Sequence, residues 1–228
     1  MDVRILGTRG EIKASARGHR NHSGVLVDGT LLFDVGEKKF LKSRPRAVFI
    51  THLHPDHAAF IREPFTIPPR TPVYAPERSV YPFIKKVTPM MLGSYRITPI
   101  PTDHSKKVKS CAYLIERGRK RLLYTGDLLW MRLQYRSKLG MLDCVITEGS
   151  FLKEGGMIRA NSAGEKWGHA GIPNLIRLFK PHAHTIVLTH FGSWFFKDIT
   201  RSHAEIALLG KQNGITLVAA HDGMELTV

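Results

Sequence analysis

The chain has 228 residues, of which 43% are hydrophobic and 23% charged, and its formal net charge is +15 at pH 7. These proportions argue against a disordered chain and fit a single domain, residues 1–228, with a substantial core. No apolar run approaches the roughly 18 residues of a membrane helix, and the chain opens into a strand pattern rather than a secretory signal. We therefore expect a cytoplasmic protein with no membrane partner.

Two features of the composition bear on partners. Cys111 and Cys144 lie in apolar, strand-like segments and are interpreted as small core residues, so neither a disulfide framework nor a thiolate cluster is indicated. The positive net charge favours an anionic, phosphate-containing substrate, with nucleic acid as one option. A surface that is merely solvated by lysine and arginine explains the same charge equally well.

The first part of the chain is predicted to form antiparallel sheet. A strand is expected over residues 3–6, and Asp28-Gly29 between the apolar runs 24–27 and 30–33 predicts a two-residue hairpin. Asp34 follows the second arm of this hairpin. It is predicted either to support a metal ligand by accepting an imidazole N–H or to cap the segment that begins at Glu37.

The segment Thr51–His57 follows a continuous apolar run, 47–50, that is typical of a buried strand. It carries three imidazoles and a carboxylate, the ligand types that zinc accepts and that also suit manganese or iron. Imidazoles this close together repel when protonated unless something binds them. Pro55 ends the sheet ladder, and Asp56 is predicted to cap a helix that begins at 58–61.

The remaining elements are predicted from apolar runs, helical spacing and glycine or proline punctuation. We expect, in chain order, a strand at 72–75, a helix at 76–86, an extended segment at 95–101, a hairpin of 108–115 with 121–124, a helix at 128–139, a buried strand at 142–147, a helix at 170–180, a strand at 185–189, a helix near 203–211 and strands at 216–219 and 224–228. Residues 153–166 are interpreted as a mobile active-site loop or as a simple connection.

Metal-ligand residue types end three further predicted strands, at His104, Asp127 and His190. Four strand ends of this kind are expected to converge on one rim of a sheet. The candidate metal ligands are then seven: His52, His54, Asp56, His57, His104, Asp127 and His190. Seven ligands are too many for one tetrahedral zinc and suit two ions that share a bridging residue. Two divalent ions are therefore expected, zinc first, with manganese or iron as alternatives.

The ordered series of Asp34, the His-x-His-x-Asp-His cluster, His104, Asp127 and His190 resembles the motifs of the metallo-β-lactamase superfamily. The resemblance implies an α/β fold, a four-layer αββα sandwich with two mixed sheets face to face and helices outside. It also implies that one ion is held by His52, His54 and His104, that the other is held by Asp56, His57 and His190, and that Asp127 bridges both.

Within that superfamily the chain is most similar to the branch of ribonuclease Z and the phosphoribosyl cyclic phosphate phosphodiesterases. The similar segments are Val3–Thr8, Asp143–Phe151 with Glu148, Gly168-His169 and Asp222–Glu225. The stretch between His57 and His104 leaves little room for the long tRNA-clamping arm of ribonuclease Z. A compact phosphodiesterase is therefore favoured over tRNA 3′ processing.

The expected reaction is phosphodiester hydrolysis of a nucleotide, a cyclic phosphate or a short nucleic acid by a hydroxide held between the two ions. His169, oriented by Glu148, is the candidate general acid, and Asp56 is assigned to catalysis as well as to a metal. His221 is predicted to line the pocket or to hydrogen-bond a ligand carboxylate. The other histidines, His19, His22, His182, His184 and His203, are interpreted as surface or structural residues.

Two other functions remain open at this point. The same metal site would support hydrolysis of a carboxyl ester, lactone or thioester, since one fold hosts many reactions. A basic nucleic-acid-binding protein with a non-catalytic metal site is the non-enzyme alternative. A homodimer is also an open expectation.

Overall fold

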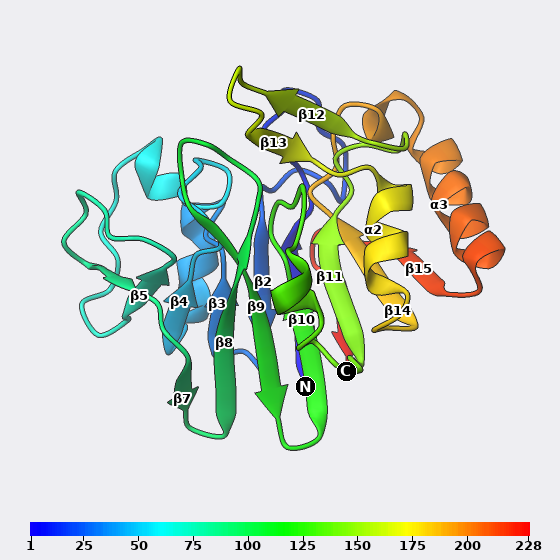
Figure 1. Ribbon diagram of the computed structural model, residues 1–228. Coiled ribbons are helices and arrows are strands. Elements are labelled where there is room, and N and C mark those ends of the chain that lie inside the picture. Colours follow the sequence, from blue (N-terminus) through cyan, green and yellow to red (C-terminus); the bar gives the residue numbers. More distant parts are fainter.

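The computed structural model describes residues 1–228 and contains two seven-stranded mixed sheets packed face to face (Figure 1). The first sheet has the order β16-β1-β2-β3-β4-β5-β6, with β1 (Asp2–Gly7), β2 (Gly24–Val27), β3 (Leu31–Phe33), β4 (Ala47–Phe49), β5 (Val73–Ala75), β6 (Ile84–Lys86) and β16 (Glu225–Thr227). The second has the order β15-β14-β11-β10-β9-β8-β7, with β7 (Met90–Leu92), β8 (Tyr95–Thr102), β9 (Ser110–Arg117), β10 (Lys120–Tyr124), β11 (Cys144–Glu148), β14 (Thr185–Thr189) and β15 (Thr216–Ala219).

The main core lies between the two sheets. Alternate residues of each strand point inward, so Phe33 and Phe49 of the first sheet meet Tyr113 and Tyr124 of the second. The Phe33 and Phe49 rings stack with centroids 5.2 Å apart, and the Tyr113 ring lies 5.5 Å from each of them. This aromatic packing fixes the separation of the sheets directly beneath the edge that carries the polar cluster.

The outer layers differ between the two sheets. Helices α2 (Ile172–Phe179) and α3 (Ile199–Asn213) cover the second sheet (Figure 1), and α2 buries Ile172, Leu175, Ile176 and Phe179, the spacing of one helix face. Two 3-10 helices, η1 (Lys38–Ser43) and η2 (Ala59–Ile61), help to cover the first sheet. The predicted two-sheet sandwich is therefore confirmed, with few helices and a cover of short 3-10 turns on one side.

Only two further short helices occur, α1 (Leu133–Arg136) and η3 (Phe195–Lys197). The longest helix is α3, with 15 residues, and no helix has the length and apolar character needed to cross a membrane.

The hairpin predicted around Asp28-Gly29 is confirmed, but three residues, 28–30, connect its paired strands rather than two. Asp28 and Gly29 have left-handed φ angles, 47° and 67°, which is the conformation of a type I′ turn. The two chain ends pair as β1 and β16, and the N-terminal ammonium donates to the Val228 carbonyl at 2.7 Å.

Two predicted helices are wrong. Residues 76–86 contain no helix and end in β6, because Pro82 lacks an N–H and clashes with a preceding turn. Residues 128–139 contain only the four-residue α1. The backbone N–H groups of Leu129 and Trp130 instead donate to the Asp103 carbonyl, so tertiary pairing replaces the helix there.

The helix predicted to begin at 58–61 is also wrong. Only the single turn η2 forms, and no side chain caps it. The Asp56 carboxylate is turned toward His190 instead, with Oδ2 2.8 Å from Nε2. The Asp56 carboxylate therefore makes a charged contact with His190 inside the site and does not cap η2.

Residues 153–166 are not a plain loop. They contain most of a β-hairpin, β12 (Met157–Ala160) and β13 (Lys166–His169), which stands above the strand ends (Figure 1). The Gly168 N–H donates to the His104 carbonyl at 2.7 Å, and this bond ties the hairpin to the loop that follows β8.

The strand directions bring the predicted site residues to one edge. Strands β10, β11 and β14 are parallel neighbours, so their carboxyl ends deliver Asp127, Glu148 and His190 to the same side. In the facing sheet β3 and β4 are parallel, and they deliver Asp34 and the Thr51–His57 segment. The rim predicted from four strand ends is therefore present.

Candidate metal centre

Asp34 is the buried support of the site. It follows β3 with a φ of 59°, a left-handed conformation that is uncommon outside glycine. Its carboxylate accepts hydrogen bonds of 2.7 Å from the Thr51 N–H and from the Tyr124 hydroxyl. It also lies 2.7 Å from Nδ1 of His57. This contact holds the His57 ring with Nδ1 protonated and leaves the lone pair on Nε2.

Three imidazole nitrogens converge on one side of the site. Nδ1 of His54 lies 3.0 Å from Nε2 of His52 and 3.3 Å from Nε2 of His104. The proton of His104 is on Nδ1, which donates to the Gly168 carbonyl at 2.9 Å, so its Nε2 is a lone pair. Lone pairs that face one another at this distance fit a shared cation.

The second side of the site is formed by Asp56, His57 and His190. Nε2 of His190 lies 2.8 Å from Oδ2 of Asp56, and Nδ1 of His190 lies 2.8 Å from the Ser150 hydroxyl. His190 has a φ of 50°, which turns its ring from the end of β14 back over the site. Strained backbone of this kind at a cluster of polar side chains is typical of functional sites.

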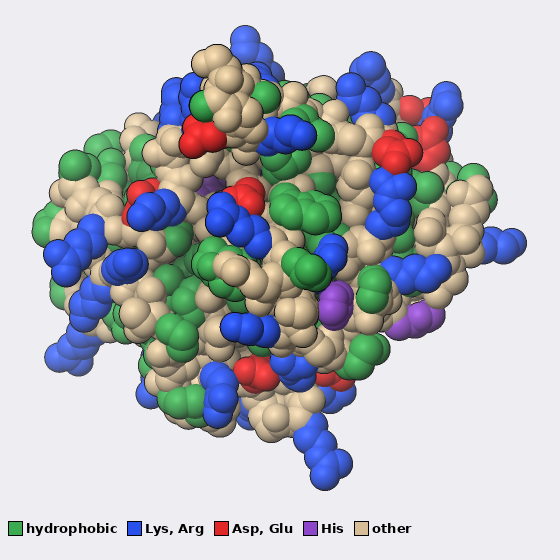
Figure 2. Space-filling view, viewed as in Figure 1, with side chains coloured by type: hydrophobic (Ala, Val, Ile, Leu, Met, Phe, Trp, Pro, Cys, Tyr) green, Lys and Arg blue, Asp and Glu red, His purple; other side chains and the backbone are tan.

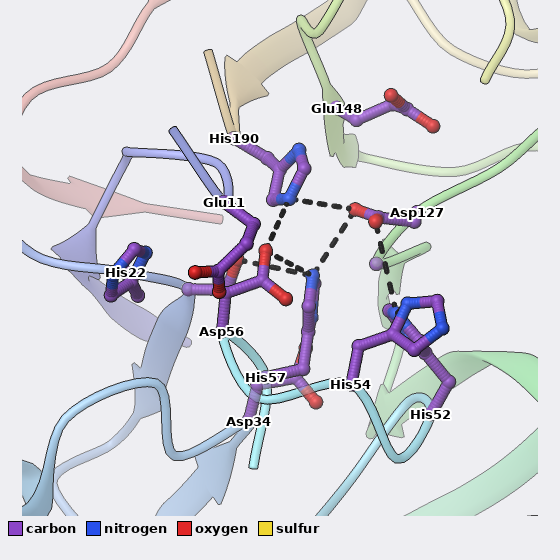
Figure 3. A network of polar contacts seen from close by, with 12 residues as sticks. Glu11, His22, Asp34, His52, His54, Asp56, His57, Asp127, Glu148 and His190 are labelled. Atoms are coloured by element: carbon purple, nitrogen blue, oxygen red, sulfur yellow. Dashed lines mark hydrogen bonds and ion pairs between the residues drawn. The ribbon is translucent and has the colours of Figure 1, made fainter. Parts of the chain in front are cut away.

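Asp127 lies between the two sides and offers one oxygen to each (Figure 3). Oδ1 is 3.1 Å from Nε2 of His57 and 3.2 Å from Nε2 of His190. Oδ2 is 3.7 Å from Nε2 of His52 and 3.5 Å from Nε2 of His104. Oδ1 is buried and has no hydrogen bond, which is costly for a carboxylate oxygen.

The donor atoms are therefore arranged as two groups of four that share Asp127, and the ligand atoms of each group lie within 4.8 Å of one another. Each group combines imidazole nitrogen with carboxylate oxygen, a donor set that divalent metal ions accept. The unsatisfied Asp127 oxygen and the facing lone pairs fit this use. These clusters of histidine and aspartate are able to bind metal.

The electrostatics differ between the two groups. Burial lowers the pKa of His52 well below its usual value and that of His54 to about 4, so these imidazoles are neutral, the form that coordinates metal. In the other group burial also opposes protonation, but the carboxylates, led by Asp127, raise the pKa of His57 and His190. This group therefore attracts positive charge, which a metal ion would supply.

Glu148 and His169 form a pair beside the ligand atoms. Glu148 is fully buried; Oε1 accepts from the Leu128 N–H, and Oε2 lies 2.8 Å from Nδ1 of His169. Burial lowers the pKa of His169, but the charge of Glu148 and this hydrogen bond outweigh it and raise the pKa to about 9. Nδ1 of His169 lies 3.9 Å from Oδ2 of Asp127, so the pair borders the cluster.

A pocket of about 290 Å³ opens over the cluster, and His54, Asp56, Asp127, His169 and His190 all reach it. Its remaining walls are made by residues 10–12 of the N-terminal loop, Ser150, Phe151, Met157 and residues 192–194. The structure thus brings together all seven candidate ligands, Asp34, Glu148 and His169.

His221 is not brought to this site. Its side chain is exposed and lies beside Gly18, outside the pocket. The expectation that it lines the pocket is therefore wrong. Tight turning of the closing segment explains this position, since the Asp222 carboxylate accepts from the backbone N–H groups of Arg20 and Asn21. His19 and His22 are buried structural residues rather than surface ones.

Several contributing residues were not singled out from the sequence. Ser150 orients His190, Tyr124 and Thr51 orient Asp34, and Met157 and Trp194 line the pocket. Ser150 lies two residues after Glu148, just beyond the end of a strand, and this position could have marked it as a site residue. Nothing in the local sequence marks the other four.

The comparisons with known proteins agree with this fold. A family model described as the beta-lactamase superfamily domain matches residues 32–191. No curated protein sequence matches the chain. Among solved structures, the metallo-beta-lactamase fold protein YhfI from Bacillus subtilis is 20% identical with a TM-score of 0.71, covering 99% of this chain and 98% of that one.

Two other solved structures are similar over the whole chain. A diphosphatase from the PhnP family is 18% identical with a TM-score of 0.70, covering 100% of this chain and 97% of that one. The short form of human tRNase Z is 16% identical with a TM-score of 0.67, covering 100% and 99%. With the fold, the ordered ligand series and the family match in agreement, the chain belongs to the beta-lactamase superfamily and has the metallo-β-lactamase fold.

Proposed function

We propose that this protein is a phosphodiesterase that uses two divalent metal ions, zinc first and manganese or iron as alternatives, to hydrolyse nucleotide, cyclic phosphate or short nucleic-acid substrates. The observation that carries the proposal is the position of Asp127, which offers one carboxylate oxygen to each of two ligand groups. Two ions bridged in this way suit in-line displacement at phosphorus.

The ligand assignment in this proposal follows the geometry. One ion would be held by His52, His54 and His104, and the other by Asp56, His57 and His190, with Asp127 shared. Such ions supply an acidified water and stabilise charge on the phosphoryl oxygens.

The remaining chemistry belongs to the protein's own side chains. Nδ1 of His169 is hydrogen-bonded to Glu148, so Nε2 is the ring atom available to donate a proton to the leaving oxygen. Glu148 holds the ring in that orientation and favours the protonated form at neutral pH. Hydrolysis of an alkyl phosphodiester needs such an acid, because an alkoxide is a poor leaving group.

Three further observations support a phosphate substrate. The net charge is +15, and Figure 2 shows lysine and arginine side chains spread across one face of the molecule, which would attract polyanions. Two of the similar structures are named as a diphosphatase and a tRNase, and the substrates that these names indicate contain phosphate. Residues between His57 and His104 form η2, the three-residue strands β5, β6 and β7, and the eight-residue strand β8 of the second sheet, which supports a compact enzyme.

Hydrolysis of bis(p-nitrophenyl) phosphate by protein purified without chelator, then supplied with zinc or manganese, tests the proposal. We expect turnover that a chelator abolishes and added metal restores, with about two ions per chain by elemental analysis. Turnover of a lactone or thioester with none of the phosphodiester would establish the rival hydrolase. Salt-sensitive nucleic-acid binding without any product would establish the non-enzyme alternative.

A further inference from the structure

A second and larger pocket, of about 660 Å³, shares the β12–β13 hairpin with the candidate metal centre. Met157 and His169 pair across this hairpin and both line the pocket over the metal ligands. Ile158, Lys166 and Trp167 of the same hairpin line the larger pocket. The hairpin is therefore a common wall of the two pockets.

Three chain segments connect the two pockets residue by residue. The segment that carries His104 continues into Ser105 and Lys106 of the larger pocket. The segment that carries Asp127 continues into Leu129 and Trp130. Likewise Trp167 stands two residues before His169. Two or three residues of extended chain span about 7–10 Å, so the backbone of these lining residues lies within about 10 Å of the residues of the first pocket.

The side chains of this larger pocket are aromatic and cationic. Trp130 is 48% exposed, and the Arg136 guanidinium carbon lies 5.5 Å from the centre of its ring. The Lys106 ammonium lies 4.5 Å from the centre of the Trp167 ring. Aromatic faces beside cations are the combination on which proteins stack nucleobases near a phosphate backbone.

The balance of charge also favours an anionic ligand. Arg132 faces the Asp103 carboxylate at 3.4 Å, so that pair is close to neutral. Neither Lys106 nor Lys166 has a carboxylate within ion-pair distance. Against these two ammonium groups stands Glu165, whose carboxylate accepts a hydrogen bond from Asn161. The pocket keeps a net positive charge next to a site proposed for phosphate.

We propose that the larger pocket binds the nucleobase of a nucleotide substrate whose phosphate lies at the metal centre, with Trp130 and Trp167 as the stacking surfaces. This inference rests on the proposed phosphodiesterase function and narrows its substrate class to nucleoside phosphodiesters. The pocket volume is within the range of small-ligand sites and leaves room for a base beside the Lys106 side chain.

The test compares AMP with ribose 5-phosphate by isothermal titration calorimetry on the metal-loaded protein. Both carry the same phosphate and pentose, so their ratio of dissociation constants isolates the base. We expect AMP to bind about tenfold more tightly, and we expect Trp167→Ala and Trp130→Ala each to remove most of that preference. Leu208→Ala, an exposed apolar side chain on α3 outside both pockets, is the matched control and keeps the preference.

Equal affinity of the wild-type protein for the two ligands would overturn the inference and favour a pentose or a simple phosphate as the occupant. A preference for AMP that both tryptophan variants retain would overturn it as well. Failure of the proposed function is seen separately. A protein that prefers AMP but does not hydrolyse bis(p-nitrophenyl) phosphate would support the base pocket and contradict the proposed phosphodiesterase function. A protein that hydrolyses this diester without preferring AMP would support the phosphodiesterase function and contradict the base pocket.

Discussion

Nδ1 of His57 lies 2.7 Å from Oδ2 of Asp34, and both side chains are fully buried. The two residues come from the ends of neighbouring parallel strands, β3 and β4. Their contact fixes the imidazole so that Nε2 points at Asp127, 3.1 Å away. A buried carboxylate behind an imidazole of this kind orients the ring and raises its basicity as a metal ligand.

Asp34→Asn should therefore weaken metal binding on the Asp56–His57–His190 side more than on the other side. The amide keeps the size of the carboxylate but loses the charge, and loss of such a partner costs about 10- to 100-fold in metal affinity. Competition with a calibrated chelator measures the affinity of each ion. We expect one of two binding steps to weaken and the other to stay within about threefold.

Asp28→Asn is the matched control for this experiment. Asp28 also has a left-handed φ, 47°, and its carboxylate also accepts a tyrosine hydroxyl, that of Tyr95 at 2.6 Å, but it lies in the β2–β3 turn away from the site. An equal loss of metal affinity in both variants would contradict the orienting role of Asp34.

Asp127→Asn should affect both ions, because Asp127 is the residue that offers an oxygen to each group. The asparagine side chain has only one oxygen, so one of the two ligand groups loses its oxygen ligand. We expect metal content to fall from about two ions to one or fewer per chain, with hydrolysis reduced at least about a hundredfold. Elemental analysis after gel filtration gives the first quantity, and full occupancy by two ions would refute the bridging assignment.

His169→Gln tests the acid role through the leaving group. General acids contribute about 10²- to 10⁴-fold for a leaving group that needs a proton. p-Nitrophenolate leaves without one. The variant should therefore lose far more kcat with a dialkyl phosphodiester that expels an alkoxide, such as dimethyl phosphate, than with bis(p-nitrophenyl) phosphate, which expels p-nitrophenolate.

Glu148→Gln supplies the companion measurement. Its amide can still accept from the Leu128 N–H but no longer stabilises a protonated His169. The same leaving-group pattern at smaller amplitude is expected. A uniform loss on both substrates in either variant would mean that the pair only supports the structure.

The strand ends in the sequence were sufficient to predict the gathering of the ligands, whereas the two-sheet sandwich was implied by the resemblance of the ordered ligand series to a known superfamily. The apolar run before Thr51–His57 and the runs before Asp127 and His190 are buried strands, and parallel pairing then sends their ends to one edge. Periodicity and residue type report these features locally. The supporting role of Asp34 was one of two roles predicted from its place after the strand, and its contact with His57 selects that role over a helix cap.

Long-range pairing explains what the sequence could not predict. Residues 128–139 have a helical pattern, yet the N–H groups of Leu129 and Trp130 donate to the Asp103 carbonyl, and nothing within the segment reports a partner so distant in sequence. The β12–β13 hairpin is a similar case, since polar, glycine-rich residues become a wall of two pockets through the bond from Gly168 to the His104 carbonyl. His221 was misplaced because the final turn is fixed by Asp222.

His19 gives a prediction for stability against pH. Its ring is 4% exposed and packs 4.9 Å from the Phe195 ring centre, and Nδ1 lies 2.9 Å from the Thr8 hydroxyl. Burial, partly offset by Asp222, lowers the pKa of His19 to about 4. The unfolded chain takes up this proton first, at its ordinary pKa of about 6.5, so protonation favours unfolding. Stability linked to His19 is therefore present above about pH 6.5 and is lost as the pH falls toward 4.

His19→Gln removes this titration, so the stability gap between the wild type and the variant should shrink by about 2 kcal/mol between pH 7 and pH 5. Urea unfolding at both pH values, with metal saturation matched, gives the free energies. His184→Gln, which replaces an exposed histidine, is the control. Protonation of the metal ligands at the lower pH affects the stability of all three proteins equally, so its contribution cancels in the comparison. A gap for His19→Gln that is the same at both pH values would show that the buried ring does not resist protonation, and the aromatic packing against Phe195 would then have to open as the pH falls.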